Sequence, residues 1–203
     1  MRNSILSILF VIAFITLIFS QIDCSRQLSD TSTSKEMRID RGKYLVNLGL
    51  CNNCHSPKIR TANGFIPDTT RLLSGSVTPI SSIKFDPKIV TMDGLNVTIG
   101  DHTAWIGPWG ISYPINLTPD KETGIGNWTE DIFIKSIRTG KHLGEGRPIL
   151  PPMPWKNIRQ LKDEDLKDIF AYLQSLKPIK NSVPDPVTAD ELTKLMLRKI
   201  KLL

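Results

Sequence analysis

Three stretches of the chain carry apolar residues at helical spacing. The first covers residues 38–49, the second begins near Asn127 or Thr129 and ends at Gly140, and the third runs from about 163 to 177 before Pro178. In each, apolar residues recur every three or four positions, as on the buried face of a helix. The pattern therefore predicts an all-α fold with three main helices. The residues on these faces are Ile39, Leu45 and Val46; Ile132, Phe133 and Ile137; and Leu166, Ile169, Phe170, Leu173 and Leu176.

Residues 58–126 lack this period and are rich in Gly, Pro, Thr and Ser. We expect a long irregular insertion here, with a short hairpin as an option. Beyond residue 184 the chain changes again: Thr188 and Glu191 have the spacing of a capping box, which predicts a C-terminal amphipathic helix within residues 185–203. Packing on the domain is the expected role of this helix, and lying on a membrane or docking a partner are its alternatives.

The N-terminus predicts export. Arg2 precedes an apolar run from Ile5 to Phe19, which has the length of a signal-peptide core and is short for a membrane span. We expect residues 1–20 to be a signal peptide and residues 21–36 a disordered tether. An uncleaved membrane anchor and a lipid on Cys24 stay open as alternatives.

Charge and length limit the kinds of protein that this sequence could encode. The net charge is +6, but Lys and Arg are scattered, apart from the last few residues, and no nucleic-acid-binding motif is present. The charge is therefore interpreted as ordinary solubility, with a basic face for an acidic partner as the alternative. Residues 37–184 are long enough for one domain with its own core.

The sequence Cys51-Asn-Asn-Cys54-His55 carries the candidate chemistry. A structural zinc site needs four ligands, and here only three histidines could join the two thiols. A disulfide oxidoreductase would place this motif at the start of a helix after a strand, and would leave His55 unexplained. The C-x-x-C-H spacing is typical of covalent haem attachment, in which each thiol adds to a vinyl group and the histidine binds the iron.

A haem iron with one histidine ligand has a sixth position. Met153 lies between Pro152 and Pro154, and prolines hold a side chain in place at low entropic cost. Met153 is therefore the preferred sixth ligand. The other candidates are Met92 as the reserve, His142 and His102 as weaker choices, and Met37 and Met196 near the two ends.

Several segments together resemble the class I single-haem cytochrome c domains, including those in the cytochrome subunits of membrane-bound alcohol and sugar-acid dehydrogenases. They are RGKYLVNLGLCNNCHSP, NLTPDKETGIGNWTEDIFIKSIRTGKH, RPILPPMPW and LKDEDLKDIFAYLQSLKPIKNSVP, which span most of residues 41–184. Two departures are Lys162, where the family usually has Ser or Thr before the last helix, and the extra residues after Pro184. The resemblance implies a cytochrome c fold, in which Gly42 lets the first and last helices cross closely and Phe170 or Tyr172 fills the gap.

The resemblance also implies a function. Cys51 and Cys54 would attach one haem c, His55 and Met153 would bind its iron, and the protein would transfer single electrons without being an enzyme itself. Methionine sulfur favours the reduced iron, and a filled sixth site leaves no room for oxygen or peroxide. The expected partners are redox proteins such as a membrane-bound dehydrogenase or a terminal oxidase. The expected location is the periplasm, with membrane association through the N-terminus or the C-terminal helix as an option. A peroxidase-like haem enzyme and a haem-based sensor stay open as alternatives.

Overall fold

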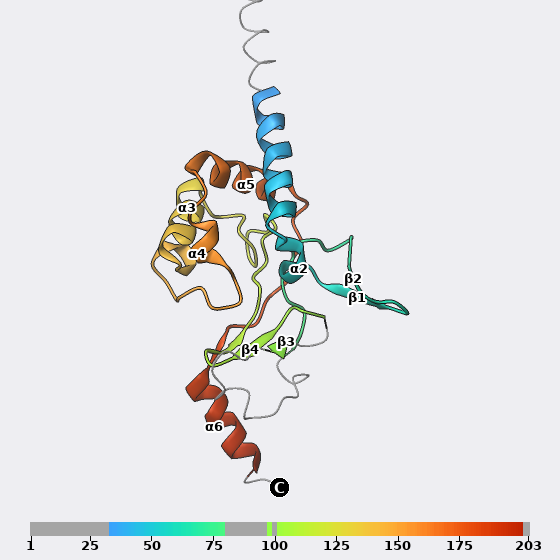
Figure 1. Cartoon of the computed structure of the whole chain (residues 1–203), viewed down its shortest axis with the longest axis vertical. Helices are drawn as coiled ribbons and strands as arrows, with labels where there is room; N and C mark the ends of the chain where they lie inside the picture. Colours follow the sequence, from blue (N-terminus) through green and yellow to red (C-terminus); the bar gives the residue numbers. More distant parts are fainter. Residues whose placement is uncertain (1–32, 80–96, 99–100, 201–203) are drawn as a thin grey trace, which may run out of the picture.

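The computed structural model describes residues 33–79, 97–98 and 101–200, and the remaining chain is drawn as a thin grey trace (Figure 1). The expected signal peptide and residues 21–32 of the expected tether lie outside these ranges. Residues 33–36, the end of that tether, are already helical. Within the described ranges, no helix has the length and apolar character needed to cross a membrane.

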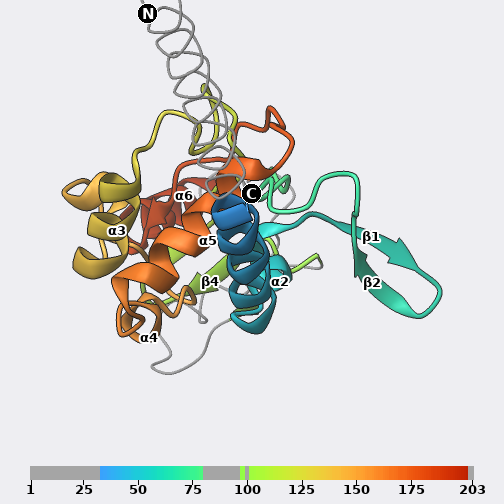
Figure 2. The same ribbon diagram turned by 90° about the horizontal axis from the view of Figure 1, so that it is seen from above.

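The predicted helices are present. Residues 33–48 form the N-terminal helix, which continues through a short turn into α2 (Cys51–His55). Helices α3 (Glu130–Thr139) and α5 (Asp163–Ser175) follow, separated by the 3₁₀ turn η3 (His142–Gly144) and the short α4 (Trp155–Ile158). Seen from above, α5 lies between the N-terminal helix and α3 (Figure 2).

Local sequence explains where these helices begin and end. Of the two candidate caps for α3, the structure uses Thr129, whose Oγ accepts a hydrogen bond from the backbone N–H of Ile132 at 3.2 Å. Gly140 ends α3 with a left-handed φ of 68°. Lys162 gives α5 no side-chain cap, but three acidic residues in the first turn favour the helix dipole.

The N-terminal helix and α5 touch through a glycine, as the resemblance implied. A Cβ on Gly42 would lie 1.9 Å from the carbonyl oxygen of Asp168 and 2.8 Å from the Cβ of Tyr172. Arg38 and Arg41 reinforce the contact by ion pairs with Asp168, which is buried. The crossing therefore requires the absence of a side chain at residue 42.

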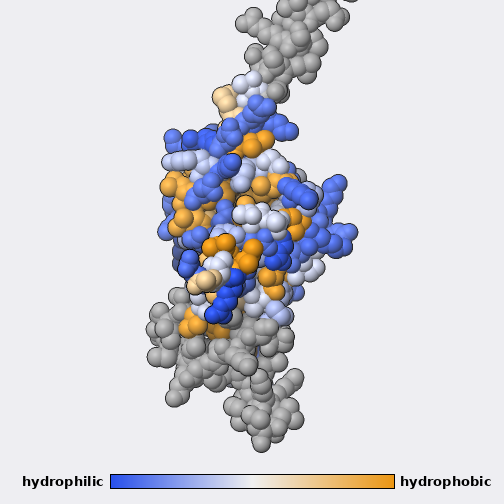
Figure 3. Space-filling view, turned by 90° about the vertical axis from the view of Figure 1, so that its right-hand side faces the viewer, coloured by the Kyte–Doolittle hydropathy of each residue, from blue (hydrophilic) through white to orange (hydrophobic). Residues whose placement is uncertain are grey.

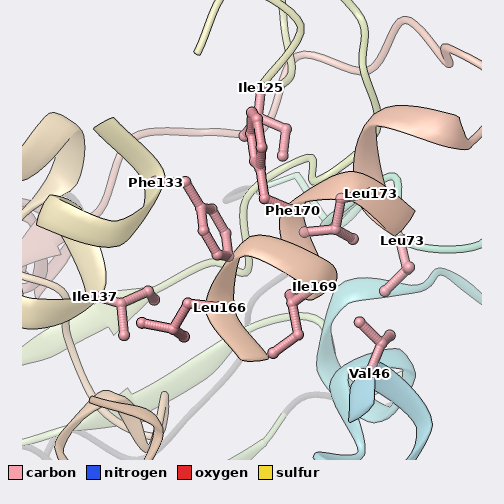
Figure 4. Packing of buried hydrophobic residues seen from close by; sticks show 9 residues of the cluster. All are labelled: Val46, Leu73, Ile125, Phe133, Ile137, Leu166, Ile169, Phe170 and Leu173. Carbon is pink, nitrogen blue, oxygen red and sulfur yellow. The ribbon is translucent and has the colours of Figure 1, made fainter. Parts of the chain in front are cut away.

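The main core lies between these helices (Figure 4). Val46 comes from the N-terminal helix, and Leu73 and Ile125 come from the insertion. Phe133 and Phe170 bring α3 and α5 together, with ring centroids 5.3 Å apart. The cluster consists of Val46, Leu73, Ile125, Phe133, Ile137, Leu166, Ile169, Phe170 and Leu173.

The expectation of an all-α fold is incomplete, because the chain also forms two antiparallel sheets. One is a hairpin of β1 (Lys58–Thr61) and β2 (Gly64–Pro67), which protrudes on the side opposite α3 and α4 (Figures 1 and 2). The other has the order β3-β4-β5-β6. Its strands are β3 (Val97–Thr98), β4 (Trp105–Gly107), β5 (Gly110–Ser112) and β6 (Val187–Thr188). Strands of two to four residues are too short to give a clear alternating pattern in the sequence.

The first part of the C-terminal segment packs on the domain. β6 pairs with β5, and α6 (Ala189–Ile200) follows directly. The predicted capping box is present: the Glu191 backbone N–H donates to Thr188 Oγ, and the Glu191 carboxylate accepts from the Thr188 backbone N–H. Leu192 is buried in a second core with residues of β4 and β5, so the first turn of α6 packs on the sheet.

Candidate haem site

The CNNCH motif forms its own short helix, α2, directly after the N-terminal helix. Leu50 makes the junction in the left-handed region, with a φ of 54°. Cys51 and Cys54 both carry free thiols and are half-buried, while His55 is buried. The two thiols and the imidazole thus lie within five residues of one helix.

The imidazole of His55 is oriented by a backbone carbonyl. Its Nδ1 lies 2.9 Å from the carbonyl oxygen of Ile115. The second ring nitrogen, Nε2, has no hydrogen-bond partner among the described residues. Burial lowers the pKa of His55, which favours the neutral ring. In the neutral tautomer, Nδ1–H donates to the carbonyl and Nε2 keeps a lone pair. This is the arrangement in which a histidine binds a metal through Nε2.

The backbone around α2 is held from several sides. The Gly75 backbone N–H donates to the carbonyl oxygen of His55 at 2.7 Å. Lys58 covers the C-terminal end of α2, because its Nζ donates to the carbonyl oxygens of Asn53 and Ser56 at 2.8 and 2.7 Å. A cation at this end of a helix also interacts favourably with the helix dipole. α2 is thereby fixed independently of its two cysteines.

The thiols differ from those of a disulfide oxidoreductase. Burial raises the pKa of Cys51 to about 11, and burial also raises the pKa of Cys54, against the opposing effect of the Lys58 ammonium. Catalytic thiols of that class have lowered pKa values. In the described ranges no three His, Cys, Asp or Glu side chains converge as metal ligands, so these residues offer no four-ligand zinc site either.

Met153 and Cys51 are half-buried side chains that pack against the same core. Met153 lies in the loop between η3 and α4. This loop is joined to α3 by the hydrogen bond from the Ile149 N–H to the Gly140 carbonyl oxygen, at 2.8 Å. Helix α4 packs near the same point, because Trp155 occupies the space where a Cβ of Gly140 would lie. A site for a large apolar group between α2 and the Met153 loop is consistent with these contacts.

The other candidates for the sixth ligand lie elsewhere or outside the described parts. Met37 is 62% exposed on the N-terminal helix. The ring of His142 makes an edge contact with Trp128, at 5.3 Å between centroids. Met92 and the side chain of Met196 are outside the described parts of the structure. His102 lies at a left-handed position, with a φ of 61°, close to the ring of Trp105.

The structure also offers polar groups for the carboxylates of a haem. A cavity of about 400 Å³ is lined by Trp128, His142 and Arg147, together with Ile115, whose carbonyl holds His55. Burial lowers the pKa of Arg147, and the carboxylate of Asp185, which lines the same cavity, acts in the opposite direction. The buried hydroxyl of Tyr113, two residues before Ile115, has no hydrogen-bond partner among the described residues. The lining of the cavity therefore holds one arginine that could face an anionic substituent, together with the carboxylates of Glu122 and Asp185.

Sequence reasoning missed three contributors to this site: Ile115, Lys58 and Ser112. Ile115 acts through its carbonyl oxygen and leaves no signature in its side chain. Lys58 follows the motif closely and could have been proposed as a helix cap. Ser112 donates a hydrogen bond to the Pro151 carbonyl oxygen at 2.6 Å, across 39 residues of sequence. Only the folded chain brings Ser112 to the Met153 loop.

Comparisons with known proteins point in the same direction. The chain is 29% identical over 149 residues to the gluconate 2-dehydrogenase cytochrome c subunit of Pantoea cypripedii, which covers 72% of this chain and 25% of that protein. It is 37% identical over 81 residues to the cytochrome c subunit of the quinone-dependent alcohol dehydrogenase of Gluconobacter oxydans, covering 38% and 17%. It is 39% identical over 82 residues to the fructose dehydrogenase cytochrome subunit of Gluconobacter japonicus, covering 40% and 16%.

The chain therefore spans a quarter or less of the length of these relatives. A family model for cytochrome c matches residues 39–177, from the N-terminal helix through α5. This range includes the CNNCH motif, the Met153 loop and the core that both contact. With the motif, the oriented imidazole and the helical core in one matched domain, the chain belongs to the cytochrome c family.

Proposed function

We propose that the protein is an exported cytochrome with a single haem c that carries electrons between redox partners. Cys51 and Cys54 would attach this haem through thioether bonds, and His55 and Met153 would bind its iron. The bound haem would supply one-electron chemistry through the Fe(II)/Fe(III) couple. The observation that carries the proposal is the His55–Ile115 hydrogen bond, because it leaves Nε2 of a buried neutral imidazole without a partner among the described residues.

The residues around the site have separate roles in this proposal. Ile115 and Gly75 hold the imidazole and its backbone in one orientation. Lys58 caps the C-terminal end of α2 through its hydrogen bonds to backbone carbonyl oxygens. The core around Leu166 and Phe170 supports the proposed site with apolar packing and excludes water. A low-dielectric setting with a thioether ligand favours the less charged, reduced iron.

The partner is proposed to be a dehydrogenase or another redox protein. The relatives are, by their printed names, cytochrome subunits of dehydrogenases that act on alcohol, fructose and gluconate. The face that carries the β1–β2 hairpin shows apolar patches among charged side chains (Figure 3). Ile59, Phe65 and Ile66 of the hairpin are at least 42% exposed. Exposed apolar patches with a polar surround are typical of protein interaction surfaces.

The alternative is a haem enzyme or sensor in which the sixth position opens. No specific contact in the described structure favours it over the electron carrier. The two classes differ in one measurable property, which is whether an added ligand reaches the iron at equilibrium.

The decisive experiment is spectroscopy of the purified ferric holoprotein. We expect the weak near-infrared band of sulfur-to-iron charge transfer, and we expect Met153→Ala to abolish it, lower the reduction potential and open the ferrous iron to carbon monoxide. Met37→Ala is the matched control, because that methionine is exposed on the far part of the N-terminal helix. A band that survives Met153→Ala would mean that another methionine is the ligand.

The same preparation tests the attachment and the function class. Haem bound through Cys51 and Cys54 stays with the protein in acidified acetone and in denaturing electrophoresis, and Cys51→Ala or Cys54→Ala reduces the yield of holoprotein. Haem that is extracted freely would contradict the thioether assignment. A wild-type protein that lacks the near-infrared band and binds carbon monoxide readily would favour the enzyme or sensor.

A further inference from the structure

The segment that presents Met153 has few hydrogen bonds of its own. Residues 151 and 152 are both proline, so neither has a backbone N–H to donate. The two prolines form a turn. In the described structure no backbone–backbone hydrogen bond involves residues 150–153, and the nearest such bonds along the chain are donated by the Ile149 N–H and accepted by the Pro154 carbonyl oxygen. Four consecutive residues, including the proposed sixth ligand, are therefore not held by a helix or a strand.

Among the described residues, one side chain from outside the loop hydrogen-bonds to this segment. Ser112, the last residue of β5, is buried and donates its hydroxyl to the Pro151 carbonyl oxygen at 2.6 Å. The Pro151 carbonyl is two residues before Met153. A hydrogen bond at this place fixes the direction in which the chain enters residue 153.

The donor itself is on a rigid support. β5 lies between β4 and β6, and Ser112 pairs with Trp105. β6 approaches closely at Gly110, where a Cβ would lie 2.0 Å from the Val187 carbonyl oxygen and where φ is +99°. Leu192 at the start of α6 packs under the same strands. The sheet thus joins the insertion and the C-terminal segment into one unit, which contacts the Met153 loop through Ser112.

From these contacts we infer that Ser112 is a positioning residue for the sixth ligand, and that the β3–β6 sheet acts through it to keep Met153 on the iron. This inference rests on the proposed function, in which Met153 binds the haem. A loop that is tied at one carbonyl has fewer conformations in which the sulfur is displaced. Ser112 therefore sets how readily the sixth position opens without touching the cofactor itself.

The test is the binding of imidazole to the ferric holoprotein, because imidazole reaches the iron only where the native sixth ligand has left. Loss of a net hydrogen bond changes an equilibrium by about two- to tenfold. We expect Ser112→Ala to tighten the apparent binding of imidazole by about that factor and to shift the loss of the near-infrared band to lower temperature. Ser175→Ala is the matched control, since Ser175 Oγ donates to the Tyr172 carbonyl oxygen within the last turn of α5.

Urea unfolding of the same variants separates positioning from general stability. The inference is supported if Ser112→Ala tightens imidazole binding more than Ser175→Ala does, at equal loss of unfolding free energy. It is overturned if the apparent affinity for imidazole is unchanged in Ser112→Ala, or if this affinity increases by the same factor in Ser175→Ala. Failure of the proposed function gives a different result: the wild-type protein itself would lack the near-infrared band, or Met153→Ala would retain it.

Discussion

At the scale of single residues, Asp68 illustrates how the loop after the hairpin is fixed near the haem motif. Its carboxylate is buried and accepts hydrogen bonds from the Thr70 hydroxyl at 2.6 Å and from Arg71 Nε at 2.8 Å. The Asp68 backbone N–H donates to the carbonyl oxygen of Pro57, two residues after His55. The hydrogen bond from the Thr70 hydroxyl, and next that from Arg71, lower the pKa of Asp68.

The sign of this shift predicts a pH dependence. A carboxylate with a lowered folded pKa contributes stability above its unfolded pKa of about 3.9, and this stability is lost as the pH falls through the folded value. We expect Asp68→Asn to lower the urea midpoint of the holoprotein at pH 7, and the difference from wild type to shrink at pH 3. Glu145→Gln is the control, because the Glu145 side chain is 82% exposed. It should change the urea midpoint neither at pH 7 nor at pH 3. A difference that grows on acidification would contradict this role of Asp68.

At the scale of secondary-structure elements, the crossing of the N-terminal helix and α5 is the contact that places CNNCH against the core. It depends on Gly42, where even one added carbon would overlap the Asp168 carbonyl. The surrounding ion pairs of Arg38 and Arg41 are partly exposed and contribute less than the packing does.

The prediction for this element is that Gly42→Ala destabilises the protein. Alanine is the better helix former by about 1 kcal/mol, but overpacking a close contact costs about 1–3 kcal/mol, and here the neighbour is backbone that cannot rotate away. We expect a net loss in the free energy of unfolding and a lower yield of holoprotein. Asn47→Ala, at an exposed position of the same helix, should have no such cost. Equal stability of Gly42→Ala and wild type would show that the helices can separate without loss.

At the scale of the whole molecule, the C-terminal segment and the insertion fold together with the helical core. Figure 1 shows the sheet with α6 on the side of the domain opposite the start of the N-terminal helix. β6 and Leu192 connect residues near the end of the sequence to β5 in its middle. We therefore expect one cooperative unit rather than a domain with an independent tail.

A core substitution in α6 tests this unity. Leu192 is 3% exposed, and a buried Leu→Ala change costs about 2–5 kcal/mol. We expect Leu192→Ala to lower the thermal midpoint followed by haem absorbance and by far-ultraviolet circular dichroism to the same extent. Lys194→Ala on the exposed side of α6 is the control. If Leu192→Ala changed only the circular dichroism, α6 would unfold separately from the haem domain.

The sequence alone determined the features that depend on near neighbours. The three main helices follow from apolar residues at helical spacing. The end of α3 follows from Gly140, and the start of α6 follows from the Thr188–Glu191 capping box, whereas the choice of Thr129 over Asn127 as the cap of α3 was made by the structure. The CNNCH motif likewise brings two thiols and an imidazole together by spacing within one short helix. Cys51 and Cys54 stay predictions as attachment sites of the haem, and His55 and Met153 stay predictions as ligands of its iron. They could be named because each lies in a short recognisable stretch.

The tertiary structure decided whatever joins residues far apart in the sequence. His55 is oriented by a carbonyl 60 residues away, and the Met153 loop is tied to a serine 39 residues before Pro151. Strands of two or three residues form because a partner strand is present, so β5 and β6 leave no pattern that could have predicted their pairing. A backbone carbonyl is the same group in every residue, and only the fold chooses Ile115 to hold the imidazole.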